Sequence, residues 1–363
     1  FGKEKEQALR LHGGGVETER AVTAGLVYLA RLQTRQGNWG DTNDFDEKYG
    51  HVLVGKTALC LLAFLGAGHT PDSGTKYSTV TRRAVNFLLA VQDKDTGHFG
   101  YTAAYSHATA TYALAECYAL TKDPGLRQPI QRAVDEILRN QQHSEDPRFD
   151  GGWSYYYPDG RIYDQWPRVS VSSWQVMALE SARLGGLRVP LKAFEDARGF
   201  LLESIDQQHG WFRYNHDPER LGSAYPTLPA STPAGLFALS LVGENLDSDQ
   251  WKRERDFILA RAPRRYRFSG DDDFVFRASG NLYFWYYSTL AMFRAGGDGW
   301  ERWNEQMKRT LLPSQDGNGS WKPISIYSRY AGDDNEDRSY STAMCVLTLE
   351  IYYRYFTPLL KVD

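Results

Sequence analysis

The chain has 363 residues and a formal net charge of −3, with 42 Lys and Arg against 45 Asp and Glu. This balance, without a basic patch, argues against a nucleic-acid partner. No apolar run reaches the roughly 18 to 20 residues that a membrane span needs, so we expect a soluble protein. An odd number of cysteines excludes a fully paired disulfide framework. Each lies in an apolar segment, which predicts three buried thiols, Cys60, Cys117 and Cys345.

The chain starts at Phe1 rather than at a methionine. We expect that an upstream segment has been removed, either an export signal or an expression tag. An export signal would place the protein in the periplasm or outside the cell. The sequence leaves the compartment and the oligomeric state open.

Amphipathic and apolar helices alternate along the chain after a charged lead-in of residues 1–16. The first amphipathic helix carries Val22, Leu26 and Leu29 on one face, which is the period of a half-buried helix. Its successor is apolar on nearly every side and must therefore be surrounded by protein. The amphipathic segments are 17–31, 80–92, one that starts at Asp123 or Pro129, 190–206, 249–262 and 300–312. The apolar segments are 51–65, 106–120, one that ends at Gly185-Gly186, one that starts at Ser231-Thr232-Pro233, 281–295 and 340–355.

This alternation indicates two concentric layers of helices with the apolar set inside. An open solenoid needs polar terminal repeats, whereas the last helix, with Met344, Leu347 and Ile351, is as apolar as the middle ones. We therefore predict an all-α fold, an α/α toroid (α6/α6 barrel) of six helical hairpins, as a single domain over residues 17–363.

The hairpins share a turn in which a Gln near the end of the amphipathic helix is followed by Gly and an aromatic residue. The aromatic positions are spaced by 60, 54, 58 and 110 residues, the last being about two periods, and are Trp39, Phe99, Trp153, Trp211 and Trp321. The fifth hairpin, near residue 267, lacks the signature. The Gln can bond free backbone groups at the helix end while the aromatic ring covers the apolar turn, which predicts a structural role for both.

This turn resembles the QW repeats of the terpenoid cyclase and protein prenyltransferase superfamily, most clearly at Gln33–Trp39 and Gln315–Trp321. Over its whole length the chain is most similar to stand-alone bacterial prenyltransferase/squalene oxidase repeat proteins. The likeness is carried by SHATATYALAECYALT, VSVSSWQVMALESARLGG, LYFWYYSTLAMFRAGGDGW and YSTAMCVLTLEIYYRYF. The resemblance implies a squalene-hopene cyclase-like toroid but no particular reaction.

Two catalytic signatures of that superfamily are missing. The resemblance to squalene-hopene cyclases implies a D-x-D-D acid, but the strings at Gly270–Asp273 (GDDD) and Asp333–Asp337 (DDNED) both depart from that pattern. The resemblance to prenyltransferase β subunits implies a zinc site, but Ser341 stands at the position of its His. A hydroxyl is a poor zinc ligand, so we predict no metal and no cofactor.

The first turns of the inner helices of such a toroid start at one rim and converge on the central cavity. The residues there are rich in aromatic side chains, which suits a ligand site. The predicted ligand-binding residues are Tyr105, Trp166, Arg168, Trp174, Tyr283, Trp285, Tyr286, Arg338 and Tyr340. The arginines could hold a carboxylate or phosphate or pair with Asp164 and Asp337. The tryptophans could stack on a sugar or a polyene or fill the core.

Two histidines and an aspartate form a candidate acid–base group. His51 and His107 occupy the same place in consecutive repeats. Together with Asp164 they could transfer protons, because His titrates near neutrality. The alternative, which the sequence favours, is that each His caps or packs at the start of an inner helix.

Three functions remain open at this stage. The first is a terpenoid-cyclase-like enzyme or prenyl-chain binder that takes an isoprenoid or aromatic-stacking ligand in the central cavity. The second is a carbohydrate-active toroid, either a polysaccharide lyase or a hydrolase. The third is a non-catalytic binding or scaffold module that presents the loops 41–49 or 152–168 to a protein partner.

Overall fold

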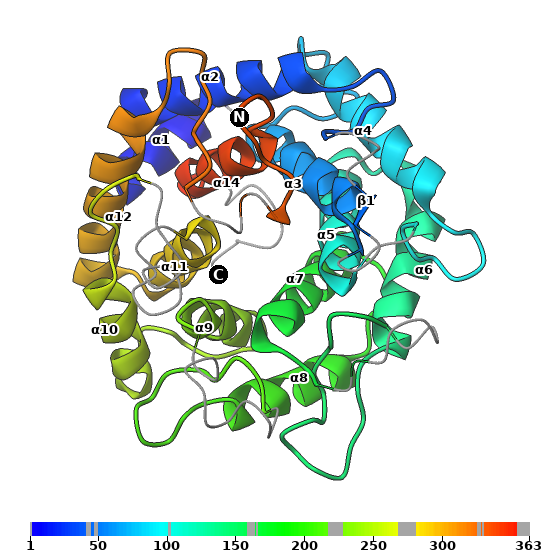
Figure 1. Cartoon of the computed structure of the whole chain (residues 1–363), viewed down its shortest axis with the longest axis vertical. Helices are drawn as coiled ribbons and strands as arrows, with labels where there is room; N and C mark the ends of the chain where they lie inside the picture. Colours follow the sequence, from blue (N-terminus) through cyan, green and yellow to red (C-terminus); the bar gives the residue numbers. More distant parts are fainter. Residues whose placement is uncertain are drawn as a thin grey trace.

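The helices form two concentric rings (Figure 1). The computed structural model describes residues 2–40, 45–46, 50–100, 103–157, 164, 166–216, 228–267, 281–324, 328 and 330–353. The inner ring consists of α3 (Val52–Gly66), α5 (Ala104–Thr121), α7 (Val169–Gly185), α9 (Ser231–Leu241), α11 (Leu282–Ala295) and α14 (Ser339–Leu349). The outer ring consists of α2 (Val16–Leu32), α4 (Ser78–Val91), α6 (Pro124–Arg139), α8 (Leu191–Glu203), α10 (Lys252–Ala260) and α12 (Gly297–Leu311).

The two rings have the burial patterns that the sequence predicts. In α7 every residue from Val169 to Ala182 is buried. In the outer helix α6 the buried residues include Leu126, Ile130, Ala133 and Ile137, which lie on one face. Short 3-10 helices precede α10 (Asp249–Trp251) and follow α12 (Leu312–Ser314). Apart from the two-residue strands β1 (Phe45–Asp46) and β2 (Gly50–His51), the named elements are helical.

The ring is closed. Each inner helix contacts the next around the ring, and α14 packs against α2 and α3 of the first hairpin. The Tyr28 hydroxyl on α2 donates to the carbonyl of Glu336, which precedes α14. The predicted α/α toroid of six hairpins is therefore confirmed.

The charged lead-in forms a further helix, α1 (Gly2–His12), at the junction of the first and last hairpins. Its Ala8 and Leu9 are buried. The indole of Trp300 on α12 donates to the carbonyl of His12 over 3.1 Å. Lys5 lies 3.9 Å from the centre of the Tyr353 ring. The lead-in thus adds packing and hydrogen bonds where the ring closes.

The repeated turn binds successive outer helices to each other. The Gln141 side-chain amide donates to the carbonyl of Gly151 in the turn and to that of Ala193 on α8, both over 2.9 Å. The indole of Trp153 is fully buried and donates to the carbonyl of Ile137 on α6. These bonds give the Gln and the Trp the structural role that was predicted for them.

The same bonds recur around the ring. The amides of Gln33, Gln92 and Gln315 each bridge a turn glycine and the next outer helix. For Gln315 that next helix is α2, because its second acceptor is the carbonyl of Ala21. The turn requires glycine: Gly151 has φ +86°, and a Cβ there would lie 2.1 Å from the carbonyl oxygen of Asp196.

The fourth hairpin differs from the sequence prediction by one residue. Phe212, rather than Trp211, is fully buried and donates its backbone N–H to the Thr232 hydroxyl. Trp153 makes the corresponding bond to Ser172. Trp211 is half-buried and stacks on His209. The prediction was wrong because two aromatic residues follow Gly210, and the larger one was taken as the repeat position.

Candidate functional site

The first turns of the inner helices meet at one mouth of the ring. The rings of Tyr105 on α5 and Tyr283 on α11 contact each other edge to face, 6.3 Å apart. The Tyr283 hydroxyl donates to the carbonyl of Ser170 on α7 over 2.9 Å. Since α5 and α11 lie on opposite sides of the inner ring, these tyrosines meet across its axis. The predicted convergence is present.

Below the mouth, aromatic side chains fill the space between α7 and α11. Trp174 stacks on Tyr286 with ring centres 6.0 Å apart, and it contacts Tyr287 edge to face at 5.5 Å. Each of the three is at most 3% exposed. Of the two predicted roles for Trp174, the structure therefore shows the core role. Its ring is not presented to a ligand in this conformation.

The predicted residues before α7 pair with one another. Arg168 donates to both carboxylate oxygens of Asp164, over 2.7 and 2.9 Å, and its guanidinium lies 4.6 Å from the centre of the Tyr155 ring. The backbone N–H of Tyr155 donates to the same carboxylate. The ring of Trp166 packs against Phe149 at 5.0 Å. Asp164 is thus held by Arg168 and by the backbone of Tyr155.

His107 does not join Asp164. Its side chain is fully buried and directed at the outer layer, with Nε2 3.1 Å from the carbonyl oxygen of Ala133 on α6. Its ring stacks in parallel on His98 at 4.7 Å. Burial holds the pKa of His107 well below its usual range. The packing alternative therefore describes His107 in this structure.

His51 and His107 are also not at equivalent positions. His51 belongs to β2 and directly precedes α3, whereas His107 lies inside the first turn of α5. The backbone of His51 pairs with Phe45, and its side chain lies outside the described part of the chain. Most of the loop 41–49, part of 152–168 and the string Gly270–Asp273 lie outside it as well.

The buried imidazole of His107 predicts a pH-dependent stability. The pKa of His107 in the folded protein lies below the value of about 6.5 that it has in the unfolded chain. Below pH 6.5 the unfolded chain therefore takes up a proton that the folded protein does not, so the folded state loses stability as the pH falls. We expect the free energy of unfolding of the wild type to fall between pH 6.5 and 5 by up to about 1.4 kcal/mol per pH unit more than that of His107→Asn. Parallel urea titrations of both proteins measure the difference, and equal slopes would contradict it.

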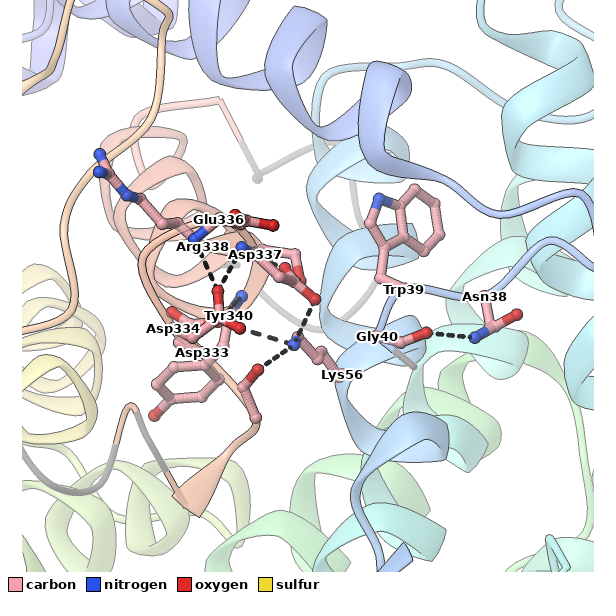
Figure 2. A network of polar contacts seen from close by, with 12 residues as sticks. Asn38, Trp39, Gly40, Lys56, Asp333, Asp334, Glu336, Asp337, Arg338 and Tyr340 are labelled. Carbon is pink, nitrogen blue, oxygen red and sulfur yellow. Dashed lines mark hydrogen bonds and ion pairs between the residues drawn. The ribbon is translucent and has the colours of Figure 1, made fainter. Parts of the chain in front are cut away.

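A charged cluster that the sequence analysis missed lies between the first and last inner helices. The Lys56 ammonium on α3 donates to Asp337 and to the carbonyl of Gly332, both over 2.8 Å, and lies 3.8 Å from Asp333 (Figure 2). Asp333 also accepts the backbone N–H groups of Tyr340 and Ser341 at the start of α14, over 2.9 and 2.7 Å. The side chains of Lys56 and Asp333 are at most 1% exposed.

A signal for this cluster is present in the sequence. Lys56 is the only charged residue in the apolar segment Val52–Gly66. A buried ammonium needs a partner. Its position on the first turns of α3 places that partner at the same mouth, where the string Asp333–Asp337 supplies it.

Asp333 has the electrostatic character of a general acid. Burial raises the pKa of Asp333 to about 7, and the repulsion of Asp337 adds to the rise. Lys56 and the hydrogen bonds from Ser341 oppose it. A carboxyl group with this pKa is protonated in a substantial fraction of molecules at neutral pH, and general acids are most effective under that condition.

A pocket of about 490 Å³ lies beside Asp333. Its lining residues are Lys322, Pro323, Asp333, Asp334, Asn335 and Arg338. The volume falls within the range of ligand pockets, about 300 to 1,000 Å³. Arg338 is held by Asp316 over 2.6 Å, not by Asp337 as one sequence alternative had it. We call this the rim pocket.

Neutral aromatic side chains lie beside Asp333. Burial and the nearby carboxyl group of Asp333 raise the pKa of Tyr340, so its hydroxyl stays neutral. The Tyr266 hydroxyl donates to the carbonyl of Lys322 over 2.6 Å, and its ring lies 6.0 Å from that of Trp285. Of the predicted ligand residues, Arg338 lines the rim pocket with Asp333, Tyr340 donates its backbone N–H to Asp333, and Trp285 contacts Tyr266. Among the described residues, no group of His, Cys, Asp and Glu is arranged to hold a metal ion.

Comparisons with known proteins identify the fold. No family model and no curated protein matches the sequence. The type II terpene cyclase MstE from Scytonema, in complex with geranylgeranyl dihydroxybenzoate, is 14% identical with a TM-score of 0.59, over 95% of this chain and 98% of that one. An inactive variant of the α-1,6-mannanase of Salegentibacter sp., in complex with α-1,6-mannotriose, is 13% identical with a TM-score of 0.64, over 92% of this chain and 99% of that one.

At these identities the likeness establishes the α/α toroid and nothing about the reaction. Both neighbours are α/α toroids, and the ligands bound in these two structures are an isoprenoid and a glycan. In the part of this chain that the structure describes, no helix has the length and apolar character needed to cross a membrane.

Proposed function

We propose that this α/α toroid is an acid-catalysing enzyme of the terpenoid-cyclase type, in which Asp333 protonates an isoprenoid ligand at the mouth of the inner ring. The observation that carries the proposal is Asp333, a residue that lines the rim pocket and whose buried carboxyl group has a pKa of about 7.

The step is a proton transfer. The O–H bond of Asp333 breaks and a C–H bond forms at one alkene carbon, which leaves a positive charge on the neighbouring carbon. Lys56, 3.8 Å from Asp333, and the N–H groups of Tyr340 and Ser341 stabilise the carboxylate that results. The aromatic rings of Tyr340, Tyr266 and Trp285 offer cation–π stabilisation to the carbocation. Water accepts a proton from the product cation, which forms a C=C bond, and Asp333 is reprotonated from the solvent, so that charge and acid are both restored.

A glycan is the second candidate ligand because the rim pocket is polar. Two acidic residues line it, Asp333 and Asp334, together with Asn335. Glycoside hydrolysis uses a pair of carboxyl groups, one of them with a raised pKa. The mannanase neighbour supports this candidate by fold analogy alone.

A substrate panel distinguishes the candidates. The full chain is incubated with squalene, prenyl diphosphates and geranylgeranylated aromatic acids, and separately with α-mannan and acidic polysaccharides, and products are analysed by mass spectrometry. We expect cyclised isoprenoid products from the wild type and none from Asp333→Asn. Cleaved glycan would establish the second candidate instead. Ligand binding without turnover would establish the non-catalytic module.

A further inference from the structure

The outer ring has a groove where the repeated turn is missing. It lies between the end of α10 and the face of α12, and it has a volume of about 540 Å³. Its lining residues are Leu259, Ala260, Ala262, Arg264, Arg302 and Gln306. We call this the basic groove. Because it is built from outer helices, it is separate from the mouth of the inner ring, and the inference drawn from it is independent of the proposed function.

The groove arises from the altered fifth hairpin. In four hairpins a Gln amide bridges the turn glycine and the next outer helix, as Gln141 does between Gly151 and Ala193. In the fifth hairpin the donors lie on the following outer helix and the acceptor lies after the preceding one. Gln306 and Thr310 on α12 both donate to the carbonyl of Pro263, over 2.8 and 3.0 Å. These two bonds join α12 to the segment that follows α10, and the groove lies beside them.

Among the described residues, the groove and its edge carry more positive than negative side chains. Arg264, Arg265, Arg267 and Arg302 are all exposed, and none of them has an ion pair with any residue in the described part of the chain. The neighbouring Lys252 and Arg309 are already paired, with Asp256 and Glu305. Against the four free guanidinium groups, α12 exposes Asp298 and Glu301. In a chain whose net charge is −3, this is a local excess of positive charge.

We propose that the basic groove binds an acidic peptide segment of a partner protein. Free guanidinium groups bind carboxylates in a bidentate geometry, so the arginines fit Asp or Glu side chains. Leu259, Ala260 and Ala262 provide an apolar surface between them. A peptide that alternates acidic and apolar side chains satisfies both features. A polyanionic glycan or a nucleic acid backbone supplies only the charge.

Fluorescence anisotropy with the full chain tests this proposal. The probe is a labelled peptide of about ten residues that alternates Glu and Leu, and the comparison peptide has Lys in place of Glu. We expect the Glu peptide to bind the wild type. The charge-reversed variant Arg264→Glu/Arg302→Glu should bind it at least about tenfold more weakly and should bind the Lys peptide instead. Arg127→Glu on α6 is the control, because Arg127 is exposed on a distant outer helix.

The outcomes separate the proposal from its competitors. Unchanged affinity in the charge-reversed variant, or equal losses in that variant and in Arg127→Glu, would overturn it. Binding of heparin or of vesicles with anionic lipid, without binding of the Glu peptide, would overturn it as well and would assign the groove to a polyanion or a membrane surface. Exposed arginines are not needed for folding, and circular dichroism of each variant checks this.

Discussion

Asp333→Asn is expected to lower the turnover of an isoprenoid ligand by at least about a hundredfold, because an amide has no acidic proton to donate. The fold should survive the change. The Asn oxygen can still accept one of the two N–H groups at the start of α14, and Lys56 keeps its bonds to Asp337 and Gly332. Single-turnover assays with the ligand identified in the substrate panel measure the effect.

Asp334→Asn is the matched control for this variant. It makes the same charge change on the adjacent residue, which is exposed and also lines the rim pocket. We expect Asp334→Asn to retain turnover within about a few fold. If both variants lose activity equally, the acid is not Asp333, and the loss reflects the charge of the acidic segment as a whole.

Phe212→Ala is expected to destabilise the protein by about 3 to 5 kcal/mol. Its ring is fully buried, and a Cβ on Gly235 of α9 would lie only 2.4 Å from it, so the ring is packed directly against the inner helix. Trp211→Ala should cost only about 1 kcal/mol, because Trp211 is half-buried and contacts His209 and Phe257 at the outer surface. Urea denaturation of the two variants gives the comparison.

The two residues are adjacent, so the comparison tests which of them belongs to the repeat. A larger loss in Trp211→Ala than in Phe212→Ala would restore the sequence-based register. It would also contradict the hydrogen bond between the Phe212 backbone and Thr232 as the counterpart of the one between Trp153 and Ser172.

The fold could be predicted because the patterns that specify it involve residues close together in the sequence. Helix periodicity separates the half-buried outer helices from the buried inner ones, and it depends only on residues three or four positions apart. The turns carry their own signal, because a glycine with positive φ and a buried aromatic ring are needed at each. Closure of the ring could be predicted because the last helix is apolar, and an open solenoid would leave that apolar surface exposed to water.

The acid site could not be predicted in the same way because its partners meet only through closure. Lys56 and its acceptor Gly332 are 276 positions apart. The string Asp333–Asp337 departs from the D-x-D-D pattern, and it is burial in the closed ring that raises the pKa of Asp333, against the effect of Lys56 from the first hairpin. Likewise, Arg338 pairs with Asp316, a residue of the preceding turn that periodicity does not single out.

For the two histidines, the spacing in the sequence led to a wrong prediction. Their spacing indicated equivalent positions, but the inner helices start at different distances from them, at Val52 and at Ala104. A shift of a few residues on a helix changes the direction of a side chain by a large angle. His107 therefore faces α6 rather than Asp164.

The titration of the Asp333 carboxyl group tests the central claim most directly. The infrared difference spectrum between the wild type and Asp333→Asn, recorded from pH 4 to 9, isolates the carbonyl band of the protonated acid. We predict that this band disappears with a midpoint near pH 7. A carboxyl group that is already ionised at pH 5 would contradict the assignment of Asp333 as the general acid that protonates the ligand.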